Sequence, residues 1–276
     1  MTGREVVDQI TTDGVVIPQS ALRQGMVGLI RAELIKLFKR RTFYVLVLVL
    51  AIFTGFLALF FFLILPEIED AFPPITKPGA YLFGAQQVLD QSWFPLILSA
   101  MFLAGELATS AWATALTRNA RRWQHLLARL LTTTGATWLA MLAAIGGLSL
   151  VVLVLAEGSG ALEIGEWWGI AWKALLVVFT WVSLGMAASS WLRAVGPAIG
   201  ATLAFSVIEG LLALWPVWQN VSLSFHTNAL MGPLDAGGFG AFAGQAPTFG
   251  RSLVVVLAWC AASIAAAWAG LVAQDA

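Results

Sequence analysis

Residues 43–65 read FYVLVLVLAIFTGFLALFFFLIL and contain no charged side chain. The hydrocarbon core of a bilayer is about 30 Å thick and an α-helix rises about 1.5 Å per residue, so about 20 apolar residues cross it. This stretch is therefore long enough to span a membrane as a helix. The basic residues Lys39, Arg40 and Arg41 precede it, and its length and flank favour an inserted anchor over a cleaved leader.

Five further apolar runs along the chain have spanning length. They cover residues 93–111, 130–156, 174–192, 194–218 and 252–274. The whole chain of 276 residues is 59% hydrophobic and only 11% charged, with a mean hydropathy of +0.85, whereas soluble domains carry about 25% charged residues. We predict an all-α membrane protein with six transmembrane helices, in which a polar N-terminal tail (1–25) precedes a single transmembrane domain (26–276).

The charged residues alternate in sign from one connection to the next. The basic ones gather before the first run, between the second and third, and between the fourth and fifth: Arg4, Arg23, Arg31, Lys36, Lys39, Arg40 and Arg41, then Arg118, Arg121, Arg122 and Arg129, then Arg193. Short loops that carry lysine and arginine stay in the cytoplasm. The sequence therefore predicts a multi-pass protein of the plasma (inner) membrane with both termini cytoplasmic.

Two segments that are predicted to be cytoplasmic show helical patterns in addition to their basic residues. Residues 26–41 place apolar side chains at helical spacing, which predicts an amphipathic helix on the inner leaflet. Attraction to anionic lipid explains Lys39, Arg40 and Arg41 but not Glu33. After Glu106, a helical stretch to about Thr117 is followed by a break at residues 118–120 and a new helix start. A short surface helix and an ordinary positive-inside loop both fit that second segment.

The outward connections differ from each other in composition. Residues 66–92 contain Pro66, Pro73, Pro74 and Pro78, which argue against a continuous helix. Residues 219–251 are rich in glycine and phenylalanine. Such a stretch between two spans predicts a re-entrant or interfacial segment buried in protein.

Several chemistries lack their sequence signatures. The chain has no GxxxxGK[ST] phosphate loop, so we expect it to hydrolyse no nucleotide and to hold no cofactor itself. His125 and His226 fall on opposite predicted sides of the membrane, which argues against a shared metal site. The 15 basic and 15 acidic residues balance, which disfavours a nucleic-acid partner. We interpret Cys260, which lies in an apolar run, as a small buried hydrophobic residue. We expect no enzymatic activity in this chain.

Two carboxylates and one row of small residues stand out within the spans. Glu106 lies near the inner end of the second run and Glu209 lies deep in the fifth, and ionisable residues inside a membrane usually have a function. Gly196, Gly200 and Ala204 are spaced four apart, a pattern that lets two helix backbones approach closely. That row fits dimerisation and packing within the chain equally well.

Three stretches together resemble the ABC-2 type permease family, the six-span membrane subunits of ABC exporters. They are RAELIKLFKRRTFYVLVL (31–48), GELATSAWATALTRNARRWQHLLARLL (105–131) and VIEGLLALWPVWQNVSLSFHTNALMGPL (207–234). The resemblance covers residues 29–274. It implies an amphipathic connecting helix at 29–41 and a cytoplasmic coupling helix at 107–118 that receives a separate ATP-binding subunit.

The family pattern of the coupling segment implies which residues act there. In the family an acidic residue begins the segment, and Glu106 matches it. A T/S-R-x-x-R pattern closes the segment, and it is matched by Thr117, Arg118 and Arg121, with Arg122 following. The resemblance also implies that Glu33 on the connecting helix takes part in coupling. The resemblance further implies two permease copies and two ATPases that bind ATP and Mg. We expect export of a hydrophobic or amphipathic substrate. A proton-coupled transporter that uses Glu209 and a non-transporting membrane scaffold are the alternatives.

Overall fold

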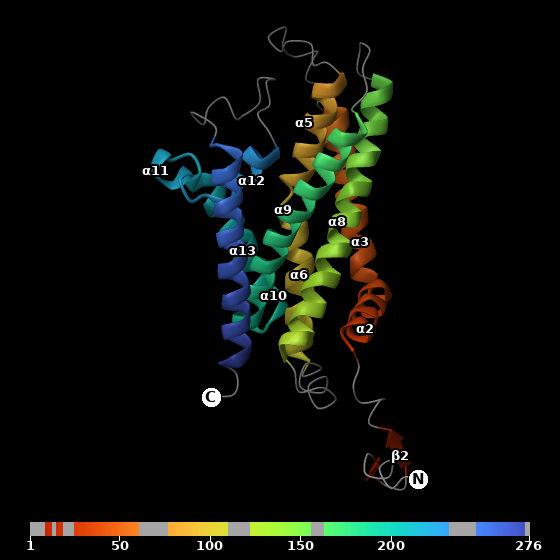
Figure 1. Ribbon diagram of the computed structural model, residues 1–276. Helices are drawn as coiled ribbons and strands as arrows, with labels where there is room; N and C mark the ends of the chain where they lie inside the picture. The colour runs from red at the N-terminus through yellow and green to blue at the C-terminus, as the bar shows by residue number, and fades with distance from the viewer. Residues whose placement is uncertain are drawn as a thin grey trace, which may run out of the picture.

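The computed structural model describes residues 9–12, 15–18, 25–60, 77–109, 122–155, 163–231 and 247–273. This part of the chain is helical apart from one short hairpin and the turns between helices (Figure 1). Six helical segments are long and apolar enough to cross a membrane: Arg41–Leu59, Gly84–Ala108, Arg122–Val154, Ile164–Leu192, Val195–Leu212 and Phe249–Val272. The predicted helical membrane fold with six spans is confirmed at this level.

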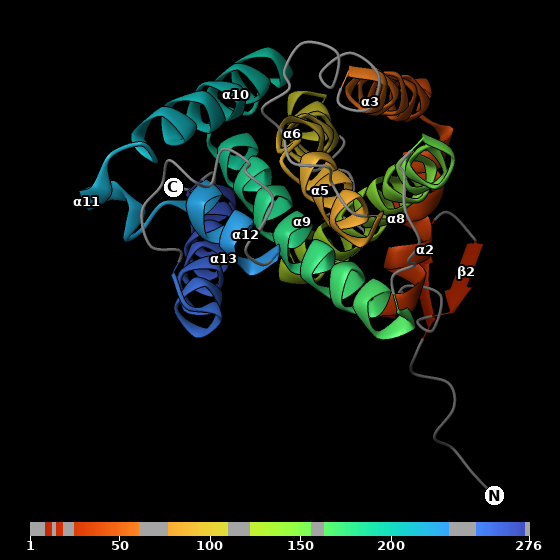
Figure 2. The same ribbon diagram turned by 90° about the horizontal axis from the view of Figure 1, so that it is seen from above.

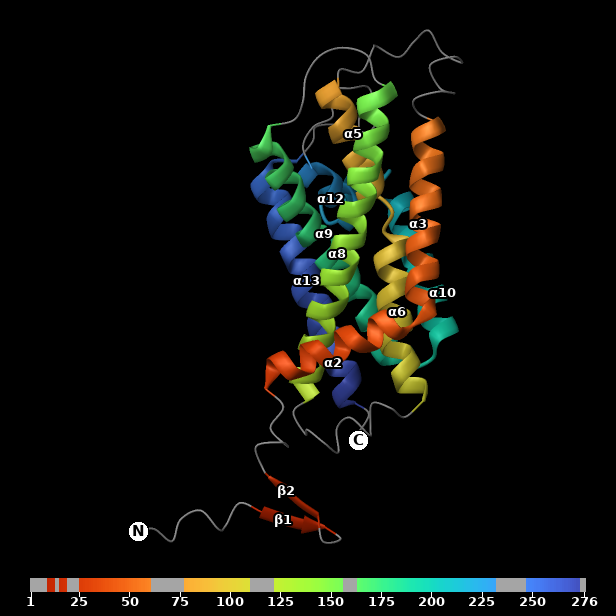
Figure 3. The ribbon, with the colours of Figure 1, turned by 90° about the vertical axis from the view of Figure 1, so that its right-hand side faces the viewer.

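The N-terminal elements lie at one end of the bundle. Strands β1 (Gln9–Thr12) and β2 (Val15–Pro18) form a short antiparallel hairpin within the predicted tail. Helix α2 (Met26–Lys39) runs across the axis of α3 (Arg41–Leu59) (Figure 3). Arg40 makes the corner, because its extended backbone separates the two helices.

The second span begins earlier than its charge pattern suggests. Helix α5 (Lys77–Leu89) leads into α6 (Trp93–Ala108) through a short break at residues 90–92. Residues 77–89 of the proline-containing stretch are helical, and residues 66–76 of it lie outside the described residues. Pro78 occupies the first turn of α5, where its missing N–H has no intrahelical partner to lose.

The remaining helices are α8 (Arg122–Leu155), α9 (Ile164–Leu192), α10 (Val195–Leu212), α11 (Pro216–Gln219), α12 (Leu223–Met231) and α13 (Phe249–Val272). Helix α10 stops at Leu212, short of the predicted end at 218, and Pro216 then starts α11 after a turn. The interfacial segment expected at 219–251 contains α12, which packs on α13, α9 and α10. Residues 232–246 of it lie outside the described residues.

Helix α9 is the centre of the bundle and contacts α6, α8, α10 and α13 (Figure 2). Small side chains permit these contacts. A Cβ added to Gly185 of α9 would lie 2.0 Å from Ser99 Oγ of α6, and one added to Gly270 of α13 would lie 2.4 Å from Ser190 Oγ of α9. Without a hydrophobic driving force between helices in lipid, such close backbone approach supplies the packing energy.

Two tryptophans on α9 show where a bilayer would fit. Trp172 and Trp191 are both exposed, and their separation of nineteen positions corresponds to about 28 Å of helix. Exposed tryptophan prefers the two membrane interfaces, and this spacing matches the hydrocarbon thickness of about 30 Å. Trp191 belongs to the C-terminal end of α9, and this end of α9 lies at the same end of the bundle as α2 (Figure 1).

Candidate functional site

Five charged side chains meet where α2, α6 and α8 converge, and we call them the charged cluster. Glu33 and Lys36 come from α2, Arg40 from the corner after it, Glu106 from the last turn of α6, and Arg129 from the second turn of α8. The two carboxylates that the sequence singled out separately, Glu33 and Glu106, are therefore neighbours in space.

Arg129 joins both carboxylates. Its Nη2 donates to Glu33 Oε2 at 3.1 Å and also pairs with Glu106 Oε2, while its Nε donates to Glu33 Oε2 at 3.3 Å. Lys36 Nζ lies 2.8 Å from Glu33 Oε1 and 3.5 Å from Glu106 Oε1. Arg40 Nη2 lies 3.5 Å from Glu106 Oε1. Each carboxylate thus has at least two cationic partners.

The centre of the cluster is removed from water. Glu33 is 3% exposed, Glu106 is 4% exposed and Arg129 is 1% exposed, whereas Lys36 and Arg40 remain partly exposed at the rim. Burial of an unpaired charge costs several kcal/mol. The three buried groups therefore depend on one another, and a helix that moved away alone would leave a charge without its partner.

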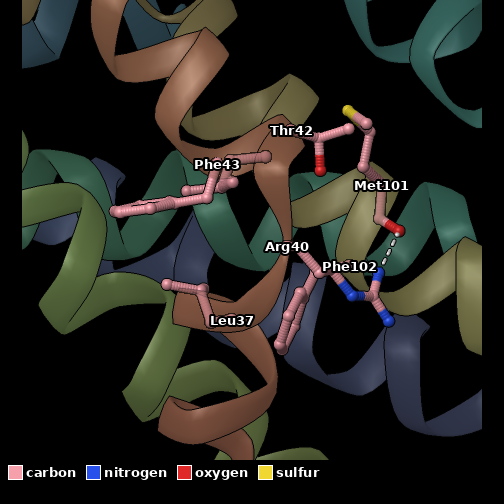
Figure 4. A pocket seen from close by; sticks show the side chains of 7 residues that line it. Leu37, Arg40, Thr42, Phe43, Met101 and Phe102 are labelled. Atoms are coloured by element: carbon pink, nitrogen blue, oxygen red, sulfur yellow. Dashed lines mark hydrogen bonds between the residues drawn. The ribbon is translucent and has the colours of Figure 1, made fainter.

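Phe102 of α6 provides an aromatic surface beside the cluster. Arg40 Cζ lies 4.8 Å from the centroid of its ring, and Arg129 Cζ lies 5.5 Å from it. Arg40 Nη1 also donates to the carbonyl oxygen of Met101 at 3.5 Å, as Figure 4 shows. The corner between α2 and α3 is thereby fixed to α6 by a hydrogen bond and a cation–π contact.

The charges of the cluster favour the ionised form of Glu33. Burial alone would raise the pKa of Glu33, but the positive charge of Arg129 and the hydrogen bond from Lys36 outweigh burial. They hold this pKa below its ordinary value of 4.5. Glu33 therefore stays negative at neutral pH, and the attraction that links α2 to α8 persists there.

The charged cluster joins α6 and α8, the two helices that flank the predicted coupling segment. Glu106 is three residues from Thr109, where the described part of α6 ends, and Arg122 starts α8 in a half-buried position. Thr117, Arg118 and Arg121 lie outside the described residues. The charge pattern places Arg129 in the basic loop between the second and third spans. Its position directly before the long uncharged run 130–156 is the signal in the sequence that this arginine is buried.

Glu209 forms a second polar centre at the far end of α10. Its Oε1 accepts from Ser222 Oγ at 2.6 Å and from the backbone N–H of Ser224 at 3.1 Å, and its Oε2 pairs with the Ser224 hydroxyl. These donors surround the first turn of α12. A carboxylate in this place satisfies free N–H groups and the positive end of the helix dipole, so Glu209 holds α12 against α10.

The small residues of α10 face away from the rest of the chain. Gly196, Gly200 and Ala204 are all exposed, and a Cβ added to either glycine would meet no atom within 4 Å. Within the chain as described, this row packs against no other helix.

Comparison with known proteins gives no match to any family model and none among the curated proteins. Within the described ranges, no three histidine, cysteine, aspartate or glutamate side chains are placed to hold a metal ion. The charged cluster and the helices around it are therefore the features of this chain that indicate a function.

Proposed function

We propose that this chain is the membrane-spanning permease subunit of an ATP-driven exporter of the ABC-2 type. The observation that carries the proposal is the charged cluster, because it ties α2 to the two helix ends that flank residues 110–121. A separate ATPase subunit would bind ATP and Mg and would dock on that segment. Its movement would reach α6 and α8 directly, and α2 through the pairs of Glu33 and Arg129.

In this proposal α2 is the connecting helix and lies on the inner leaflet. Its buried face carries Leu29, Glu33 and Leu37, while Arg31 and Lys39 are exposed. Exposed basic side chains suit the anionic surface of the cytoplasmic leaflet. The α2 end of the bundle is then cytoplasmic, which agrees with the alternation of charge along the sequence, and the protein belongs to the plasma (inner) membrane.

Reversal of charge in the docking segment should uncouple the ATPase. We expect a tagged chain, purified from its native host, to carry an ATP-binding subunit with it. Arg118→Glu combined with Arg121→Glu should reduce the recovered ATPase and its activity by about tenfold, as expected for loss of charged contacts at an interface. Arg193→Glu, at the same end of the bundle but outside the docking segment, is the matched control. Undiminished ATPase in the double variant would favour the plain positive-inside loop.

A second copy should pack on the exposed row of α10, since family members act as dimers. Gly200→Leu adds bulk where the chain leaves open space, so the subunit should fold normally while its dimer weakens. Ala204→Cys, in a Cys260→Ala background, should form an intersubunit crosslink that Gly200→Leu prevents. Val254→Cys is the control, because Val254 is 67% exposed on α13. Misfolding of Gly200→Leu would instead indicate packing within the chain.

Two alternative functions make different demands on the same residues. A proton-coupled carrier needs Glu209 as its titrating group, whereas the hydrogen bonds of Glu209 give it a capping role. A non-transporting scaffold needs neither an ATPase nor Glu209. The substrate of the exporter remains a hydrophobic or amphipathic molecule in our proposal, because α3 and α10 expose mainly apolar side chains.

A further inference from the structure

The break between α5 and α6 lies inside the membrane. Ser99 packs against Gly185, which is six residues from the interface marked by Trp191. Ser92 at the break lies seven residues further along α6. The two intervals together place the break about 20 Å from the α2-side interface, within a hydrocarbon core about 30 Å thick. Interrupted helices at such depth are tolerated only within protein or beside a polar cavity.

Three consecutive side chains at this break reach three different helices. Gln91 Nε2 donates to Thr54 Oγ1 of α3 at 3.4 Å, and the hydroxyls of Ser92 and Ser206 of α10 lie 2.8 Å apart. The Asp90 carboxylate accepts from the side chain of Asn228 on α12. The break is thus a polar centre that the surrounding helices hold in place.

Two groups at the break have unused bonding capacity. Gln91 is 4% exposed, and its Oε1 has no hydrogen-bond partner within the described part of the chain. Asp90 remains exposed, and no ion pair joins it to a lysine or arginine among the residues that the structure describes. A carboxylate at this depth without a cation is costly, and it indicates a functional site.

Asp90 lies in an exposed row that runs along α5 and α6. The row has helical spacing and consists of exposed or half-exposed residues: Leu82, Gln86, Asp90, Trp93, Ile97, Met101 and Gly105. Helices α3 and α10 flank α6 on both sides of it (Figure 2). From Trp93 toward the α2 end the row is apolar, so a single acidic group sits at one end of an apolar surface.

We infer that the break between α5 and α6 binds the ammonium group of a cationic amphiphile, with Asp90 as counter-ion and the apolar row below it as the surface for the hydrocarbon tail. Trp93 follows Asp90 in the row and is partly exposed, and the face of a tryptophan ring suits an organic ammonium. A hard metal ion would need about six oxygen ligands, and one carboxylate with an amide oxygen is a poor match. The inference rests on the proposed export function only in treating this amphiphile as cargo.

Equilibrium binding of radiolabelled dodecyltrimethylammonium tests the site. The full chain in phosphatidylcholine nanodiscs should bind it saturably above the background of empty nanodiscs, and neutral dodecyl maltoside should compete poorly. Asp90→Asn should bind about tenfold more weakly, because a charge-assisted contact is lost. Asp90→Glu should restore most of the affinity. Size-exclusion profiles and thermal unfolding should show that both variants are folded.

The control variant removes an acidic group elsewhere on the outer side. Glu166 is exposed on α9, and Gln can replace it in its capping box, so Glu166→Gln should bind like the unaltered chain. Unchanged binding by Asp90→Asn, or an equal loss in Glu166→Gln, would overturn the inference. Displacement of the probe by Na⁺ but not by K⁺ at equal ionic strength would show an inorganic ion site instead. The assay contains no ATP or ATPase, so its failure is distinguishable from failure of the export proposal.

Discussion

Arg129→Leu should destabilise the protein by about 3–5 kcal/mol, the usual cost of breaking a buried ion pair from one side. The substitution leaves Glu33 and Glu106 buried next to each other, with only Lys36 and Arg40 at the rim to neutralise them. Chemical or thermal unfolding of the purified chain in nanodiscs measures the loss. Arg31→Leu is the matched control, because Arg31 is exposed on α2, and a surface substitution should change stability by less than about 0.5 kcal/mol.

A charge-conserving variant separates the charge from the geometry of Arg129. Arg129→Lys should recover part of the stability, since an ammonium keeps the positive charge but cannot place two donors on Glu33 as the guanidinium does. Equal stability of Arg129→Leu and Arg31→Leu would show that the cluster contributes little, and the proposed mechanical link between α2 and α8 would then fail.

Acidification should weaken the cluster only at low pH. The pKa of Glu33 lies below its ordinary value of 4.5 in the folded chain. The stability that Glu33 contributes is therefore fully present above about pH 4.5 and is lost as the pH falls through the folded-state pKa. The ion pairs of Glu33 therefore stabilise the fold at neutral pH.

The spans were predictable because bilayer thickness constrains sequence directly. Each helix that crosses must bring a long apolar run, and the residues within that run can be counted. The ends of the spans are less predictable, because a charged residue beside an apolar run does not always mark the end of the span. Asp90 illustrates this: helices lie on both sides of the break at 90–92, and only the side chain of Asn228 donates to the Asp90 carboxylate among the described residues.

The charged cluster could not be assembled from the sequence. Glu33 and Glu106 were recognisable as unusual, but Arg129 is 96 residues from Glu33 along the chain. No helical spacing rule relates residues at such a separation, so the pair follows only from the packing of α2 against α8. The capping role of Glu209 is hidden in the sequence for a related reason. The chain turns back from α10 to α12 over residues 213–222, whereas the apolar run predicts that the span continues to residue 218.

Removal of the Glu209 carboxylate should loosen α11 and α12 locally. Glu209→Ala leaves the Ser222 and Ser224 hydroxyls and the Ser224 N–H without their acceptor, at a cost of about 2–3 kcal/mol. Hydrogen exchange of residues 216–231 should accelerate by about 30- to 140-fold, because each 1.4 kcal/mol is a factor of ten. Glu209→Gln should give an intermediate effect, since it keeps one oxygen but turns an NH₂ group toward donors. Unchanged exchange in Glu209→Ala would contradict the capping role.

The Glu209→Gln variant also distinguishes an ATP-driven exporter from a proton-coupled carrier. Uptake of the amphipathic dye rhodamine 6G into inverted vesicles should require ATP and persist with an uncoupler if the chain is a permease with its ATPase. Glu209→Gln should then lower uptake only in proportion to the folded protein recovered, because the carboxylate supports α12 and carries no proton in the cycle. A proton carrier predicts the opposite: uptake indifferent to ATP, abolished by the uncoupler and abolished by Glu209→Gln at full protein recovery. That result would overturn the exporter proposal, since energy would enter through Glu209 rather than through the segment between Glu106 and Arg129.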